Sequence, residues 1–158
     1  MTTAGFGREL LATAAAAGLA RTYVDVQLRK LGCVEVVHDA QLVATELVAN
    51  AIAECEWGGT IRIFLGWRPR GLVFGVWDPG TRMPRRGPMP ELTLGTLDLD
   101  PAGFDRNGGR GLAVVAALTR DLWVERSRPG GKWVCALLDV TARPEPRPVD
   151  VHGSEIKP

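Results

Sequence analysis

The sequence has little net charge, no long hydrophobic run and no regular cysteine pattern. Its 158 residues carry a net charge of +1, so no global field favours nucleic acid or anionic lipid as a partner. No stretch reaches the roughly 18 consecutive apolar residues of a membrane span, and the N-terminal segment lacks the basic-then-apolar order of a secretory signal. The three cysteines are far apart without C-x-x-C spacing, which argues against a disulfide framework or a zinc site and indicates the cytoplasm.

Two common nucleotide-binding motifs are missing as well. The G-x-x-x-x-G-K-[ST] pattern of a P-loop does not occur in the chain. A Gly-Gly-Arg-Gly cluster at 108–111 follows a long loop, whereas the glycines of a dinucleotide-binding fingerprint come directly after a strand. Neither motif therefore explains the glycine cluster.

Hydrophobic residues make up 46% of the chain, which fits one globular domain over residues 1–140. Residues 141–158 are rich in proline and poor in apolar residues, so a disordered tail is predicted there. The elements expected along the domain are a helix at 7–31, a helix at 36–55, strands at 60–67 and 72–78, a loop at 79–107, a helix at 112–118, and strands at 122–126 and 132–140.

This order of elements predicts an α+β fold. Strand pairs joined by tight turns become antiparallel neighbours, and the helices are segregated from them along the chain. We therefore expect a two-layer α/β sandwich, with a mixed, mostly antiparallel sheet covered on one face by helices. The strands are apolar on both faces for much of their length. We therefore expect the face without helices to be hidden from solvent as well.

Glu46 and Asn50 are four residues apart in the second expected helix, and so lie on one face of it. Such a pair is ordinarily part of a solvated helix face. Here most neighbours of Glu46 at helical spacing are apolar, among them Leu42, Val43 and Ala49. A carboxylate in an apolar patch is strongly disfavoured unless it finds a partner. The pattern favours a carboxylate with a specific role.

Asp78 comes directly after an apolar strand, and Pro79 and Gly80 end that strand. A carboxylate at the end of a strand, at the floor of a cleft, can accept a hydrogen bond from an exocyclic amine. Asp-Pro-Gly is also good turn chemistry, and that alternative stays open.

Gly109, Arg110 and Gly111 precede Leu112, where an apolar helical pattern begins. Free N–H groups at a helix start form an anion site, helped by the positive end of the helix dipole and by the lack of side chains. The cluster therefore predicts that the backbone approaches a phosphate. The later pair at 130–131 is expected to turn a hairpin.

The series E-x-x-x-N, D-x-G, long loop and G-x-G resembles the GHKL (Bergerat-fold) ATP-binding family. Within it, the chain is most similar to the anti-sigma-factor serine/threonine kinase branch of actinobacterial type. The matching segments are "ELVANA" (46–51), "WDPGTRMP" (77–84), "GGRGLAVV" (108–115) and "GGKWVCALL" (130–138). The resemblance spans residues 8–140.

This resemblance implies a role for each matching residue. Asn50 would coordinate Mg²⁺ that bridges the nucleotide phosphates, and Glu46 would act as general base. Asp78 would accept from the adenine amino group, and Gly80 would let the backbone approach the base. Residues 82–107 would form the ATP lid. The phosphates would be held by Gly109, Arg110, Gly111 and Leu112.

The chain departs from the family pattern in three places, which together involve four residues. Ala53 and Glu54 stand where a basic residue and a histidine are common in the family, and Arg82 replaces a glycine. Trp133 replaces a hydroxyl residue that helps hold the water bound to the adenine. Two functions therefore stay open. One is a kinase that uses Mg-ATP to phosphorylate a protein, and the other is a catalytically silent binding module that acts by protein contact.

The resemblance also implies partners. For the kinase these are ATP or ADP and a sigma factor, an anti-anti-sigma protein, or both. Whether the protein forms a homodimer stays open. His38 and His152 are the only histidines, which argues against autophosphorylation on histidine. Direct nucleic-acid binding is a third and weaker interpretation, because the arginines cluster only in loops, and no membrane partner is expected.

Overall fold

The computed structural model describes residues 5–84 and 110–141. Its elements, in chain order, are β1 (Gly5–Leu11), α1 (Ala16–Lys30), the short 3-10 helix η1 (Val34–Val36), α2 (Val37–Ala53), β2 (Thr60–Arg68), β3 (Gly71–Asp78), α3 (Arg110–Leu118), β4 (Thr119–Arg126) and β5 (Lys132–Leu138). Most of the predicted lid at 82–107 and most of the predicted tail at 141–158 lie outside the described residues. Gly109 lies outside them as well.

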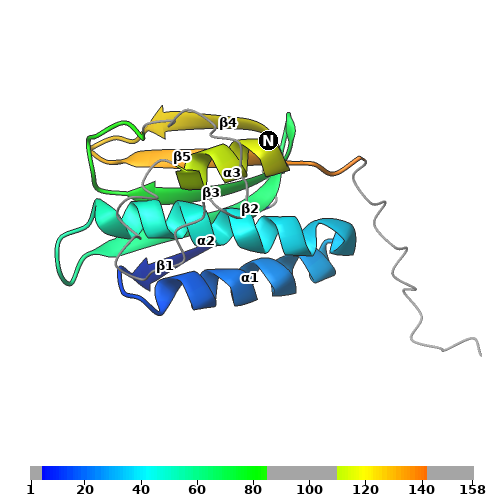
Figure 1. Ribbon diagram of the computed structural model, residues 1–158, viewed down its shortest axis with the longest axis horizontal. Coiled ribbons are helices and arrows are strands. Elements are labelled where there is room, and N and C mark those ends of the chain that lie inside the picture. Colours follow the sequence, from blue (N-terminus) through cyan, green and yellow to red (C-terminus); the bar gives the residue numbers. More distant parts are fainter. Residues whose placement is uncertain (1–4, 85–109, 142–158) are drawn as a thin grey trace, which may run out of the picture.

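The described strands form one sheet in the order β1-β2-β3-β5-β4, and each neighbouring pair is antiparallel. The helices α1, α2 and α3 lie together on one face of this sheet (Figure 1). The α+β two-layer prediction is confirmed. Among the described residues, no helix is long and apolar enough to span a membrane.

The core lies between α2 and the sheet because both elements bury one apolar face. In β3, alternate residues such as Phe74 and Val76 point toward the helices and are almost fully buried. Leu47 and Val48 of α2 are buried in the same cluster. At the end of β3 the same alternation places Asp78 on the helix side of the sheet, which sets its position in the site described below.

The first predicted helix was wrong at its N-terminal end. Residues 7–11 belong to the edge strand β1, which pairs with β2, and α1 starts only at Ala16. The alanine- and leucine-rich composition favoured a helix, but Gly5 and Gly7 are poor helix formers. A Cβ on Gly5 would overlap the ring of Phe64, so the close approach of β2 requires a glycine there.

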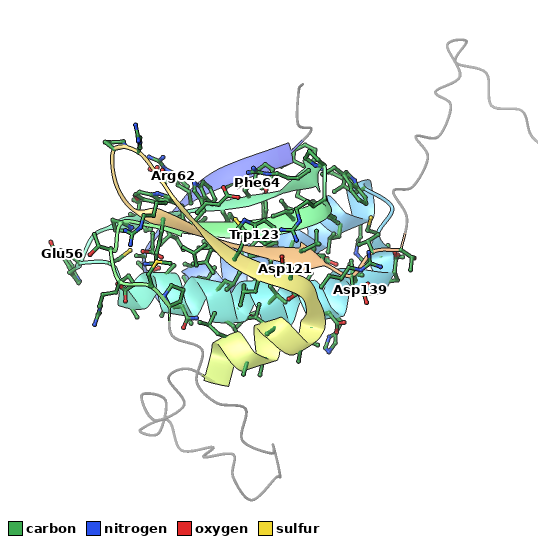
Figure 2. The ribbon with its side chains drawn as sticks, turned by 90° about the horizontal axis from the view of Figure 1, so that it is seen from above. Glu56, Arg62, Phe64, Asp121, Trp123 and Asp139 are labelled. Atoms are coloured by element: carbon green, nitrogen blue, oxygen red, sulfur yellow. The ribbon has the colours of Figure 1, made fainter. Side chains whose placement is uncertain are left out.

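The second face of the sheet, which we call the outer face, consists of Phe64, Val73, Trp77, Trp123, Trp133, Cys135 and Leu137. Arginines lie over its aromatic rings, with guanidinium-to-centroid distances of 4.8 Å for Arg62 over Trp77 and 4.9 Å for Arg70 over Trp123. Figure 2 shows Arg62 on the side of the sheet away from α2 and α3. Val73 and Cys135 beneath them are only 1% and 2% exposed. The aromatic rings and arginines thus bury the small apolar residues of the outer face, while the rings themselves stay partly exposed.

Truncation of Phe74 tests this core. Phe74→Ala should lower the free energy of unfolding by about 3–5 kcal/mol, because it leaves a cavity between α2 and the sheet. Leu19→Ala is the control, since Leu19 is 55% exposed and should change stability by roughly 0.5 kcal/mol or less. Urea unfolding of both variants measures the difference. Equal effects would contradict the proposed location of the core.

Candidate functional site

Polar side chains collect where the last turns of α2, the end of β3, the first residue of β5 and the first turn of α3 come together. At one end of this region Asp78 faces Lys132, and at the other end Glu46 faces Gly111. The two ends are linked by α2, which carries Glu46 and Asn50 and ends next to Gly80. Segments far apart in the sequence therefore meet along α2, and we treat their polar residues as one candidate site.

Asp78 and Lys132 form a buried ion pair. They are directly opposite each other in the β3–β5 register, and Lys132 Nζ donates to Asp78 Oδ1 over 2.8 Å. Their side chains are 3% and 4% exposed. The Gly80 N–H also donates to Asp78 Oδ1 at 2.8 Å, and Lys132 Nζ reaches the Gly80 carbonyl at 3.4 Å. The turn after β3 is thus fastened to the start of β5.

Burial raises the pKa of Asp78 above its usual range. The hydrogen bond and positive charge of Lys132 act in the opposite direction, as does the Gly80 N–H, while the negative charge of Glu54 adds to the rise. Removal of Lys132 would therefore leave a desolvated carboxylate without its main counter-charge.

Glu54 and Arg82, two of the departures from the family pattern, are partners. Arg82 Nη2 lies 3.3 Å from Glu54 Oε1, and the Glu54 side chain is 21% exposed. A Cβ on Gly80 would lie 2.5 Å from Glu54 Oε2 and 2.8 Å from Glu54 Cβ. Gly80 is therefore required for the close packing of the turn against the end of α2.

Glu46 lies against the first turn of α3. A Cβ on Gly111 would overlap Glu46 Oε2, so the carboxylate occupies space that only a glycine leaves free. Burial raises the pKa of Glu46. Asn50, one turn further along α2, is half-buried, and Leu112 is 4% exposed in the core. Arg110 begins α3.

The structure changes the interpretation of the matching segment at 130–138, which contains β5. Trp133 does not face Asp78: it lies opposite Trp77 on the outer face, and Lys132 takes the position toward the site. Gly131 has a φ of +79°, and a Cβ there would overlap the Asp78 carbonyl oxygen. It turns the hairpin, as predicted, and also packs against the end of β3.

A comparison with protein-family models matches residues 9–138 to the family described as histidine kinase-like ATPase domain. The match covers most of the chain. The protein belongs to the histidine kinase-like ATPase domain family. The GHKL prediction is thereby confirmed, and the chain is an ATP-binding domain. A comparison with curated proteins finds no match.

In this ATPase-like domain, the candidate site also suits a magnesium ion. Among the described residues, no group of three or more His, Cys, Asp or Glu could hold a metal by itself. Mg²⁺ held on nucleotide phosphates needs only one or two protein oxygens and prefers hard oxygen donors. Asn50 offers an amide oxygen and is half-buried on the same helix face as Glu46, so it fits such an ion.

Sequence reasoning missed Lys132 as a site residue. A signal was present, because Lys132 is the one charged residue in the otherwise apolar segment 132–138, and it lies two positions before Val134 on the same face. Only the β3–β5 register shows that this face is the helix side and that its partner is Asp78.

The raised pKa of Glu46 predicts a pH-dependent stability difference. A carboxyl group whose pKa is higher in the folded than in the unfolded state makes stability fall as pH rises between the two pKa values. Glu46→Gln removes this penalty and should raise the melting temperature at neutral pH. The gain should vanish as pH falls to about 4, near the ordinary pKa of glutamate.

Glu35→Gln is the matched control, since Glu35 is exposed at the start of η1. It should show little change in melting temperature at either pH. A lower melting temperature of Glu46→Gln than of wild type at neutral pH would contradict the inference that the ionised Glu46 carboxylate destabilises the folded protein.

Proposed function

We propose that the protein is a Mg-ATP-dependent serine/threonine kinase of the anti-sigma-factor type, which phosphorylates an antagonist protein. The contact between Glu46 and the first turn of α3 carries this proposal. It brings a desolvated carboxylate to the helix start where phosphates would bind. A general base next to a phosphate site is what phosphoryl transfer to a hydroxyl group needs.

The adenine end of the nucleotide is assigned to Asp78 and Gly80. Within the part of the chain that the structure describes, both hydrogen bonds to the Asp78 carboxylate go to Oδ1. A carboxylate has about four acceptor positions, so Oδ2 can accept from the adenine amino group. Gly80 has no side chain to separate the turn from the base.

The phosphate end is assigned to the first turn of α3 and its neighbours. The N–H groups of Gly111 and Leu112 lie in the first turn, where backbone donors lack partners within the helix. Gly109 and Arg110 would complete this cradle. Asn50 would hold Mg²⁺, which neutralises phosphate charge when bound.

The Glu46 carboxylate would accept the proton of the attacking serine or threonine hydroxyl. Its raised pKa brings it closer to the working pH, where a general base is most effective. A sigma factor and an anti-anti-sigma protein are the proposed protein partners, with the cytoplasm as the location. In this role, whether ATP or ADP is bound would control the contact of the protein with these partners.

The Glu54–Arg82 ion pair supports a second candidate, the catalytically silent binding module. It occupies two positions where this chain departs from the family pattern, and it places the exposed Arg82, the first residue of the predicted lid, beside the C-terminal end of α2. Such a module would still bind ATP, but its action would depend on protein contact alone.

Incubation with labelled Mg-ATP and candidate antagonist proteins tests the kinase. Label should move to a serine or threonine of the antagonist. Glu46→Gln should slow transfer by about 10²–10⁴-fold, the usual contribution of a general base. Nucleotide affinity should not fall in this variant, because the residues assigned to the adenine and to Mg²⁺, Asp78 and Asn50, are unchanged.

ATP binding is measured in parallel by thermal shift. At a hundredfold its dissociation constant, Mg-ATP should stabilise wild type by about 2.7 kcal/mol. If wild type shows this stabilisation but transfers no label to any antagonist, and Glu46→Gln binds partners normally, the silent module replaces the kinase.

Gly111→Ala tests the contact at α3 separately. Its Cβ would displace the Glu46 carboxylate, which is the mobile end of a flexible side chain, so the fold should survive while phosphoryl transfer falls at least about tenfold. Gly130→Ala is the control, because a Cβ there meets nothing within 4 Å. Unchanged transfer in Gly111→Ala, with circular dichroism confirming the fold, would contradict the assigned role of Glu46.

A further inference from the structure

We propose that Lys132 and Asp78 together recognise the edge of the adenine base. In this arrangement Asp78 accepts from the exocyclic amino group and Lys132 donates to the ring nitrogen beside it. The inference rests on the proposed nucleotide site and adds to it a second residue that determines base specificity.

Among the described residues, the contacts of the pair leave one donor and one acceptor for a ligand. An ammonium group has three N–H donors, and Lys132 Nζ uses two acceptors, Asp78 Oδ1 at 2.8 Å and the Gly80 carbonyl at 3.4 Å. Oδ1 also receives the Gly80 N–H at 2.8 Å, so both hydrogen bonds that described residues donate to the carboxylate lie on the same oxygen. The third N–H of Lys132 and the lone pairs of Asp78 Oδ2 form an adjacent donor and acceptor.

The pair interrupts an otherwise apolar surface. The preceding residues of β3 and the following residues of β5 on the helix side are Val76, Phe74, Val134 and Ala136, all buried. A buried ion pair adds little stability compared with apolar residues of similar size. Stability therefore does not explain why a charged pair lies here. Recognition of the polar edge of a ligand does explain it.

The local charges match an uncharged base better than a phosphate. Asp78 and Glu54 contribute two negative charges around Gly80, and Lys132 and Arg82 contribute two positive charges. The charges of these two ion pairs cancel, so the pairs themselves offer hydrogen bonds without a net attraction for anions. The phosphates belong at the other end, at the first turn of α3.

The same arrangement discriminates between purines. In adenine the amino group lies between two acceptors, N1 and N7, so either nitrogen can face Lys132. In guanine a carbonyl oxygen takes the place of the amino group and would face the Asp78 carboxylate without a hydrogen between them. We expect strong preference for ATP over GTP, since a buried acceptor without a donor is disfavoured.

Calorimetric titration of the wild-type protein with Mg-ATP, Mg-1-deaza-ATP and Mg-7-deaza-ATP tests the proposal. Each analogue replaces one ring nitrogen with C–H. One analogue should bind on the order of tenfold to a hundredfold more weakly than ATP, as expected for the loss of a hydrogen bond from a charged donor. The other should bind like ATP, and the weaker one identifies the nitrogen that Lys132 contacts.

A variant removes the donor. Lys132→Met should bind ATP and the discriminated analogue with equal affinity, while Lys30→Met, at an exposed position in the last turn of α1, should keep the wild-type difference. Because Lys132→Met leaves Asp78 buried without its partner, the double variant Asp78→Asn/Lys132→Met is measured beside it. The wild-type titrations need no variant to fold.

Two results would overturn the proposal in different ways. If wild type binds ATP and both analogues equally while Asp78→Asn weakens ATP binding, Lys132 has only a structural role and the proposed nucleotide site stands. If Asp78→Asn binds ATP as wild type does, the base lies elsewhere, and both the site and this inference fail.

Discussion

The candidate site depends on one buried ion pair, Asp78 with Lys132. Burial disfavours the ionised carboxylate of Asp78, and the ammonium group of Lys132 opposes this effect. The pair exists only because β3 and β5 are aligned so that these residues face each other on the helix side of the sheet. The chemistry of the site therefore depends on the β3–β5 register and on the turn at Gly80, whose N–H donates to the same Asp78 oxygen.

Two of the three departures from the family pattern also lie beside the turn at Gly80. Considered in the sequence alone, Glu54 and Arg82 are unusual residues that put function in question. In the structure they form an ion pair across Gly80. The third departure, Trp133, belongs to the outer face, where it packs with Val73 and Cys135. None of the three introduces an unpaired charge into the site.

Most of the fold could be predicted because its signals are local. The α2 helix follows from its apolar periodicity, and the hairpin of β2 and β3 from two apolar runs around a short turn. The β1 strand could not be predicted in this way, since its stability comes from pairing with β2 rather than from its own composition. The motifs placed Glu46, Asp78 and Gly111 in candidate roles, but Lys132 required the register. The contact of Glu46 with Gly111 likewise depends on how α3 packs against α2.

The central claim is that the end of β3 and the start of α3 hold the two ends of one nucleotide. A crystal structure with Mg²⁺ and a non-hydrolysable ATP analogue tests it most directly. The account predicts the adenine amino group within hydrogen-bond distance of Asp78 and the phosphates at the N–H groups of Gly111 and Leu112. An analogue bound away from Asp78, or with its phosphates away from α3, would contradict it.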